Sequence, residues 1–463
     1  MPAPNREMND AFNRELERER EYDHQELDLV VQTNVPLLNP QQKEVYDTLM
    51  KAIDDGNSGL YFLDAPGGTV ASSGIAATLL EGCRTAHSAL KLPLNLQTIE
   101  ELTCNIAKNS AMAKVLSASK IIIWDERTMA HKRALEALNR TLKDLRNDSR
   151  CFGGAMILLS GDFRQTLPVI PRSTASDEIN ACLKSSNLWR YVKKLQLTTN
   201  MRVALLNDTS AKDFSEQLLT IGNGRVPVDE SSRLISFPQN FCNFVSSKDE
   251  LINKVFTNII TNYKNNEWLS ERAILAAKNK DVDDLNHIIQ NEIIGTMHSF
   301  KSIDCVTNED EVSNYPIEFL NSLDVPGLPP HNLRLKVGSV VIMLRNINQP
   351  KLCNGTRLVV SKLMNNVIYA TILKGKFEGE EALIPRIPMI PTDMPFEFKR
   401  LQFPIRLAFA MTINKVCGLN LENPCFSHGQ LYVACSRVGR PSALFVLAPD
   451  NKTKNVVYHE VLN

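Results

Sequence analysis

The sequence has no lysine between Lys51 and Lys91, although that stretch begins like a phosphate-binding loop. Its 10 cysteines form no Cys-x-x-Cys pair and no group with histidine at the spacing of zinc ligands. The sequence therefore shows no zinc-binding motif, and the cysteines are expected to be reduced thiols of an intracellular protein. No apolar run is long enough to cross a bilayer and the amino terminus is polar, so we expect neither a membrane anchor nor a signal peptide. The 52 basic residues balance 52 acidic ones, so the net charge is zero. The net charge therefore does not indicate a protein whose whole surface attracts nucleic acid.

The chain is long enough for two or three domains, because its 463 residues exceed the usual size of one. Its strand candidates are continuous apolar runs, which is typical of parallel strands covered on both faces. These runs occupy residues 59–64, 119–124, 155–160, 194–198, 272–276, 404–413 and 443–448. Helical patterns lie before and between them, at 40–53, 132–146 and 280–293. Strand and helix alternate twice over, so we expect two α/β domains.

Shifts in composition predict where these domains begin and end. Residues 1–36 carry dense charges of both signs and are expected to be a solvated N-terminal extension. We expect the first α/β domain at 37–198 and the second at 199–463. Within the second, 297–332 is rich in Pro, Asn and Asp and is predicted to be an extended connection. Short β-rich stretches in 333–402 favour a small β-barrel or sheet inserted into that domain.

A nucleotide cradle begins after the first strand and then stops. The strand Leu60–Asp64 is followed by Ala65-Pro66-Gly67-Gly68-Thr69, which suits a loop around phosphates. Such a loop normally continues with Gly-Lys-Ser/Thr into a helix, because the lysine reaches the phosphates and the hydroxyl holds Mg²⁺. Here Thr69 is followed at once by Val70-Ala71-Ser72. The signature of an ATPase is therefore half present.

Acidic and amide side chains follow two later strands. Asp125 and Glu126 come directly after an apolar run, and Gln165 lies in the polar turn after another. Phosphoryl transfer to water needs a carboxylate on Mg²⁺ and a second group that orients or deprotonates the nucleophile. Asp125 suits the first role and Glu126 the second, and Gln165 suits a γ-phosphate sensor.

Three further residues suit a nucleotide site. Arg202 and Arg437 each follow apolar residues, and guanidinium groups match the charge of a transferring phosphoryl group. Gln42 lies just ahead of the first helix, where an amide suits an adenine edge. Taken singly, each candidate has a structural alternative: an acidic pair at a strand end, a loop amide, a salt-bridged arginine or a surface glutamine.

Together and in this order, the motifs resemble the Pif-type (petite integration frequency) DNA helicases, a branch of superfamily-one helicases. The likeness is greatest to the helicase region of Helitron-type rolling-circle transposons and covers nearly the whole chain. It is carried by residues 37–42, 64–69, 71–78, 82–93, 124–126, 161–165, 200–202, 354–357 and 428–438.

The resemblance implies two RecA-like P-loop NTPase domains, the second with a β-barrel-like insertion. It implies a helicase that uses ATP and Mg²⁺, moves 5′ to 3′ on single-stranded DNA and unwinds forked or duplex DNA. It further implies a monomeric, nuclear protein of replication, recombination, DNA repair or telomere maintenance. No residue of the chain selects among these processes.

By position, the resemblance also implies roles for single residues. Gln42 contacts adenine, while Gly67, Gly68 and Thr69 form the phosphate cradle. Asp125 holds Mg²⁺, Glu126 is the base, Gln165 senses the γ-phosphate, and Arg202 and Arg437 are arginine fingers. Ser72, Thr85, His87 and Thr412 are implied to contact DNA. For His87 the alternative is a polar residue that closes a helix.

The chain departs from this family pattern in two places. After Thr69 the lysine, the Mg²⁺-binding hydroxyl, the following helix and most of a central strand have no residues to form them. After Lys415 a Ser-Gln-Gly-Gln-Thr-like stretch that touches nucleotide and DNA is missing. One preorganised donor to transition-state charge is worth about 3–4 kcal/mol, and several are lost together. We therefore predict that the chain as written has no meaningful ATPase activity and an unstable first domain.

Three interpretations follow from these departures. The chain is an active helicase whose gene model has lost coding blocks, a decayed transposon copy, or a catalytically dead DNA-binding protein. The intact motifs on both sides of each gap favour the first. Neutral net charge weighs against the third.

Overall fold

The computed structural model describes residues 23–64, 86–93, 101–170, 173–198, 209–308, 314–348, 351–391, 394, 396–412 and 417–463. These residues fall into two compact units. The first holds the described parts of Met1–Ser72 and Arg84–Asn207 together with Tyr458–Asn463, and the second holds the described parts of Asp208–Val457. In the described part of the chain, no helix has the length and apolar character that crossing a membrane requires.

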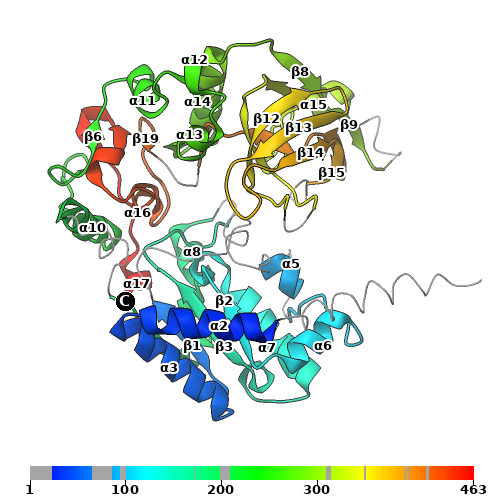
Figure 1. The fold of residues 1–463 in the computed structure, drawn as a ribbon, viewed down its shortest axis with the longest axis vertical. Coiled ribbons are helices and arrows are strands. Elements are labelled where there is room, and N and C mark those ends of the chain that lie inside the picture. Colours follow the sequence, from blue (N-terminus) through cyan, green and yellow to red (C-terminus); the bar gives the residue numbers. More distant parts are fainter. Residues whose placement is uncertain are drawn as a thin grey trace, which may run out of the picture. The chain divides into compact units, whose positions relative to one another are not determined.

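A four-stranded parallel sheet forms the centre of the first unit (Figure 1). Its strands are β1 (Leu60–Asp64), β2 (Ile121–Trp124), β3 (Met156–Gly161) and β4 (Val192–Gln196), in the order β2-β3-β1-β4. All four lie where the apolar runs predict strands, and the parallel pairing confirms the expected α/β class. Phe62 and Ile157 are buried in the core of this unit, which continuous apolar runs produce when both faces of a sheet are covered.

Helices precede and connect these strands. The longest are α3 (Pro40–Asp54) and α7 (Lys132–Arg146), as the periodicity predicts. α7 buries Leu135, Leu138 and Leu142 on one stripe and ends at Asn147, whose left-handed backbone (φ 50°) stops the helix. The other helices are α2 (His24–Asn34), α5 (Ala86–Leu90), α6 (Ala111–Ala118), α8 (Ala175–Ala181) and α17 (His459–Leu462). Short 3₁₀ turns occupy Val35–Leu37, Arg127–Met129, Cys151–Gly154, Leu183–Ser185 and Trp189–Tyr191.

The last residues of the chain pack on the first unit, whereas the sequence reading assigned them to the second domain. Val461 on α17 is 2% exposed and belongs to the core of the first unit. Lys184 donates hydrogen bonds from Nζ to the carbonyl oxygens of Leu462 and Asn463. Such long-range packing leaves no local sequence signal.

The second unit contains a parallel sheet of its own, in the order β18-β7-β19-β20-β6. These strands are β6 (Asn243–Phe244), β7 (Ile274–Ala276), β18 (Ala410–Met411), β19 (Gly418–Asn420) and β20 (Phe445–Leu447). Its helices are α10 (Thr209–Gly222), α11 (Lys248–Val255), α12 (Ile259–Asn262), α13 (Asn266–Ser270), α14 (Asn279–Glu292) and α16 (Gln430–Cys435). A small antiparallel pair joins β5 (Ile235–Ser236) to β21 (Lys452–Thr453).

The second unit also carries a β-rich part made of antiparallel strands (Figure 1). Five strands pair in the order β14-β13-β12-β11-β17. They are β11 (Val340–Met343), β12 (Arg357–Leu363), β13 (Val367–Ile372), β14 (Glu381–Pro385) and β17 (Ile405–Leu407). The predicted single strand at 404–413 is therefore wrong, because it divides into β17 in this sheet and β18 in the parallel one.

Residues 297–332 are not an extended connection, and this prediction is also wrong. They hold β8 (His298–Lys301), β9 (Ile303–Val306) and α15 (Ile317–Ser322), and they end where β10 (Asn332–Leu335) begins. β8 pairs with β10, and β9 pairs with β16 (Phe398–Gln402), which also pairs with β15 (Ile387–Met389). The strand that pairs with β9 lies far along the chain, so no local pattern predicts this pairing. The local Pro, Asn and Asp content instead predicts a loop.

Candidate nucleotide-binding site

Three neighbouring strands of the first unit end at the same edge of its sheet. In the parallel register Asp64 of β1 lies opposite Gly161 of β3, and Trp124 of β2 lies opposite Leu159. The residues that follow these ends therefore share one edge. In open α/β sheets, ligands bind outside the carboxyl ends of the strands.

Asp125 is tied to the neighbouring strand at this edge. Ser160 donates a short hydrogen bond from Oγ to Asp125 Oδ1, and the backbone N–H of Glu126 donates to the same oxygen at 2.8 Å. Burial raises the pKa of the Asp125 carboxyl, and these two hydrogen bonds act in the opposite direction. The result is a half-buried carboxyl group with a fixed orientation.

Glu126 sits in a backbone conformation that is uncommon for a residue with a side chain. Its φ of 49° and ψ of 36° lie in the left-handed region. The next residue, Arg127, is fully buried and donates to the carbonyl oxygens of Ala130 at 2.5 Å and His131 at 2.9 Å. Its guanidinium lies 4.4 Å from the ring centroid of Trp124. Arg127 therefore locks the turn that presents Glu126.

Burial of Arg127 disfavours the charged form of its guanidinium. Burial lowers the pKa of its guanidinium to about 9. The sequence reading did not select this residue. In the sequence, Arg127 is marked only by its position directly after Asp125 and Glu126. An arginine at such a position is ordinarily expected on the surface.

The turn after β3 is built on Asp162, which is also fully buried. Asp162 Oδ1 accepts hydrogen bonds from the backbone N–H of Arg164 at 3.0 Å and from Arg164 Nη1 at 2.9 Å. The Asp162 carbonyl oxygen accepts from the backbone N–H of Gln165 at 3.0 Å. A Cβ at Gly161 would lie 2.9 Å from Thr128 Cγ2, so the turns after β2 and β3 approach too closely for a larger residue. Gln165 is thus held at the same edge as Asp125.

Asp64 adds another carboxyl to this edge. Burial raises the pKa of Asp64, and the nearby charge of Asp162 raises it further.

Among the described residues, no three acidic, histidine or cysteine side chains lie close enough together to hold a metal ion. Mg²⁺ in nucleotide sites is usually held by one or two carboxylates and the phosphates of the substrate, so an oriented Asp125 fits that ion. Bound Mg²⁺ would supply positive charge to the phosphate oxygens.

Gln42 has a structural role that the sequence reading did not consider. Its Oε1 accepts from the backbone N–H of Asn39 at 3.0 Å, while Asn39 Oδ1 accepts from the backbone N–H of Gln42 at 2.9 Å. This reciprocal pair is a capping box at the start of α3. The amide donors of Gln42 are not used in the cap. The neighbouring Gln41 bonds Thr198, which fixes α3 to the segment after β4.

The remaining predicted site residues are spread over the chain. Arg437 follows α16 and is half-buried, and Thr412 is exposed directly after β18, so both belong to the second unit. His87 lies in α5, and its side chain is not described. Six predicted residues lie outside the described part of the chain: Gly67, Gly68, Thr69, Ser72, Thr85 and Arg202.

Comparison with protein families gives two matches. Residues 69–232 match the model of the PIF1-like helicases, and residues 318–363 match the model of the 2B domain of the DNA helicase Pif1. The second match falls on α15, β10 to β12 and the segments between them.

Curated relatives agree with these matches. The chain is 24% identical to the ATP-dependent DNA helicase PIF1 of Xenopus laevis over 82% of this chain and 54% of the relative. It is also 24% identical to the human PIF1 helicase, over 90% of this chain and 62% of the relative. The chain thus spans little more than half the length of these relatives. By the family models and these relatives, the chain is similar to the PIF1-like helicases.

Solved structures show the same fold. The Pif1 helicase of Candida albicans superposes with a TM-score of 0.60 at 21% identity, covering 92% of this chain and 98% of that one. A Bacteroides Pif1 helicase in complex with ADP-AlF3 and single-stranded DNA also gives a TM-score of 0.60, at 19% identity over 89% and 93% of the two chains. The chain therefore shares the RecA-like α/β fold of these Pif1 helicases.

Proposed function

We propose, from this relationship to the PIF1-like helicases, that the chain is the motor part of an ATP-dependent DNA helicase. Its reaction would couple ATP hydrolysis to 5′-to-3′ movement on single-stranded DNA and to unwinding of forked or duplex DNA. The observation that carries the proposal is the edge of the first sheet. There Ser160 orients Asp125, and the adjacent turn built on Asp162 presents Gln165. The related Bacteroides helicase was solved with a nucleotide analogue and single-stranded DNA, which supports both ligands for this chain.

Each residue of this edge has a proposed task. Asp125 would hold Mg²⁺, Glu126 would accept the proton of the attacking water, and Gln165 would contact the γ-phosphate. Gln42 would use its free amide donors for adenine, since its Oε1 serves the cap. Other assignments rest on the resemblance alone: Gly67, Gly68 and Thr69 for the phosphates, Arg202 and Arg437 as arginine fingers, and Ser72, Thr85, His87 and Thr412 for DNA.

We further propose that the chain as printed cannot run this reaction. It lacks the lysine and hydroxyl that should follow Thr69. In the structure, β2 pairs only with β3 among the described residues, and Ile123 in that strand is 65% exposed. An apolar strand of a parallel sheet normally has a neighbour on both sides and cover on both faces. Among the described residues this edge of β2 is unpaired, which supports the proposed loss of a neighbouring strand.

Two origins of this loss remain alternatives. One is an active helicase whose gene model omits coding blocks, and the other is an inactive, DNA-binding remnant of a transposon helicase. The intact residues around Asp125 and Asp162 favour the first, because mutation without selection would also disrupt their buried hydrogen bonds.

The resemblance to these helicases carries further proposals. They are an origin among Helitron-type helicases, a nuclear location, a monomeric state, and a role in repair, recombination or telomere maintenance.

Phosphate release from the purified chain tests the proposal of a broken motor. We expect no release above that of Glu126→Gln, with or without single-stranded DNA. Insertion of Gly-Lys-Thr and the following helix and strand from a PIF1 relative after Thr69 should restore DNA-stimulated release, and Glu126→Gln should abolish it again. DNA-stimulated release by the printed chain would contradict the proposed impairment. No release from the repaired chain, with its fold confirmed by circular dichroism, would contradict the proposed helicase function.

A further inference from the structure

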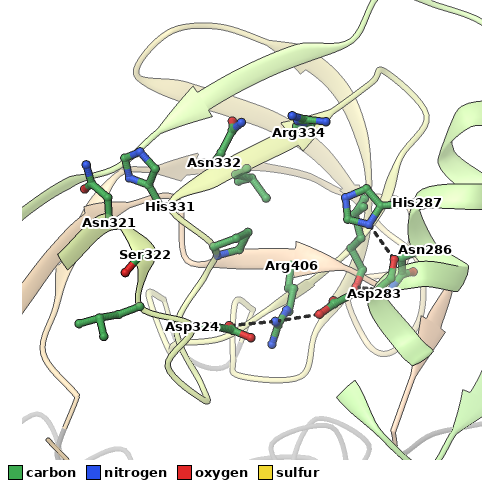
Figure 2. A pocket seen from close by; sticks show the side chains of 14 residues that line it. Asp283, Asn286, His287, Asn321, Ser322, Asp324, His331, Asn332, Arg334 and Arg406 are labelled. Carbon is green, nitrogen blue, oxygen red and sulfur yellow. Dashed lines mark hydrogen bonds and ion pairs between the residues drawn. The ribbon is translucent and has the colours of Figure 1, made fainter. Parts of the chain in front are cut away.

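A cavity of about 360 Å³, lined by both polar and apolar residues, lies wholly within the second unit. α14, the residues after α15, β10 and β17 form its walls (Figure 2). Pockets that hold small organic groups have volumes of roughly 300 Å³ or more. The cavity is therefore large enough for a single nucleobase.

One wall of the cavity is rich in hydrogen-bond acceptors. Arg406 Nη2 lies 3.3 Å from Asp283 Oδ2 and 3.5 Å from Asp324 Oδ1, so one guanidinium is shared by two carboxylates. The pair with Asp324 is long, and the Asp324 side chain is 75% exposed. Asp324 can therefore accept hydrogen bonds from a ligand without losing a tight partner.

The opposite wall is rich in donors. Figure 2 shows Asn332 and Arg334 of β10 across the cavity from Asp283, Asp324 and Arg406. The backbone of Arg334 pairs with Ser299 of β8, and its carbonyl oxygen accepts from Gln290 Nε2 at 3.0 Å, while Arg334 is exposed. Asn332 accepts a short hydrogen bond at Oδ1 from Ser299 Oγ, which leaves its amide donors for other partners. The fold thus does not consume the donors of this wall.

The backbone around the cavity is held firmly. Arg400 and Asp304 are both fully buried and form a two-pronged ion pair with N–O distances of 2.8–3.1 Å. Arg400 also donates to the carbonyl oxygens of Leu320, Leu323 and Pro329. This one side chain anchors the segment that carries Asp324. The cavity is therefore preformed, which lowers the entropic cost of binding.

We propose that this cavity binds an unstacked guanine base of single-stranded DNA. Guanine carries two donors, N1–H and N2–H, on one edge, which match the carboxylate of Asp324. Its O6 and N7 acceptors lie on another edge and match a guanidinium, the commonest specific contact of arginine with a base. Pro330, Leu333 and Leu407 supply apolar surface for the faces of the ring.

The other bases match less well. Cytosine has an amino group but no ring N–H donor beside it, adenine has neither that ring N–H donor nor an O6 acceptor, and thymine has no amino group. The proposal rests on the proposed DNA binding of the chain and adds base selectivity to it. It therefore predicts a ranking with guanine first, which non-specific phosphate contacts do not produce.

The first test uses free nucleosides, which carry no phosphate. Saturation-transfer NMR with the full chain should show guanosine binding more strongly than cytidine, adenosine or thymidine. Arg334→Gln and Asp324→Asn should each reduce the guanosine signal at least fivefold. Arg225→Gln is the matched control, because Arg225 is an exposed arginine outside the cavity, and it should keep the signal. Equal signals for the four nucleosides, or an unchanged signal in both cavity variants, would overturn the proposal.

The second test separates the cavity from DNA binding as such. Fluorescence anisotropy compares a thymine oligonucleotide with the same oligonucleotide containing one guanine. We expect the guanine to tighten binding on the order of tenfold in the parent chain and not in Arg334→Gln. Equal binding of the two oligonucleotides would reject the cavity proposal and leave DNA binding intact. Guanosine binding without any oligonucleotide binding would support the cavity and reject the proposed helicase function.

Discussion

Asp125 and Asp304 show two ways in which this chain buries a carboxyl group. Asp304 has a buried guanidinium as its partner, Arg400, and both side chains are inaccessible to solvent. Asp125 instead accepts hydrogen bonds from the hydroxyl of Ser160 and the backbone of Glu126, and burial raises its pKa. The first arrangement serves the fold, whereas the second holds a carboxyl in an orientation that suits a cation. The two should respond to substitution in opposite ways.

Asp304→Asn should destabilise the second unit strongly. The change leaves the Arg400 guanidinium buried without its counter-charge, which costs about 3–5 kcal/mol in comparable buried pairs. Urea unfolding followed by circular dichroism measures this loss. Asp47→Asn is a suitable control, because the Lys43–Asp47 pair is exposed and should be worth about 0.5 kcal/mol or less. Equal losses in the two variants would contradict the structural role of Asp304.

Asp125→Asn should stabilise the first unit at neutral pH. Burial raises the folded-state pKa of Asp125 above its ordinary value of 3.8. Between the ordinary and the raised pKa the folded chain binds more protons than the unfolded chain, so stability falls as pH rises through that window. Asparagine removes this dependence. The melting temperature of the variant should exceed that of the parent at pH 7, and the difference should shrink as the pH is lowered below the folded pKa. A variant that melts below the parent at pH 7 would contradict this account.

At the scale of elements, β2 has the composition of a central strand and the position of an edge strand. Ile121, Ile122 and Ile123 precede Trp124, yet β2 pairs with β3 alone among the described residues. Ile123 on this strand is 65% exposed. Exposed apolar edges promote association between chains, and natural proteins usually cover or charge them.

Ile123→Lys tests whether this edge is truly open. In the printed chain the exposed side chain contributes little, so unfolding free energy should change by about 0.5 kcal/mol or less. A charged edge should also reduce aggregation at high protein concentration, which light scattering measures. If a further strand covered β2, the same lysine would be buried, and the loss would be several-fold larger. Ile122→Lys, at a less exposed position of the same strand, provides the comparison.

The elements differ in how far local sequence predicts them. The strands β1 to β4 and the helices α3, α7 and α14 were placed to within about two residues, because apolar runs and helical periodicity are local signals. The sequence does not predict β8, β9 and α15, because the local Pro, Asn and Asp content favours a loop there and β9 pairs with β16, far along the chain. Arg400 and Asp304 are separated by 96 residues, so no local pattern joins them.

Some residues at the edge of the first sheet can be predicted from the sequence, and others cannot. Asp125, Glu126 and Gln165 follow predicted strands, so the shared edge could be anticipated from the parallel register. The buried Arg127 and the organising role of Asp162 could not, because both depend on contacts made only in the folded turn. The capping role of Gln42 was accessible, since an Asn-x-x-Gln spacing at a helix start is a local signal.

At the scale of the whole molecule, two independent observations support the proposal that residues are missing between Thr69 and Val70. In the sequence, the phosphate cradle passes directly into the next family motif without its lysine. Among the described residues of the structure, the first sheet has four strands, and its apolar strand β2 pairs with β3 alone. The second unit has a five-stranded parallel sheet. The proposed loss accounts for both the absent lysine and the unpaired edge of β2 among the described residues.

The most direct test of this claim is the sequence of the transcript across the codons for Thr69 and Val70, read together with tryptic peptides of the natural protein. We predict additional in-frame codons that restore Gly-Lys-Thr and encode the following helix and strand. A transcript and a peptide that join Thr69 directly to Val70 would contradict it.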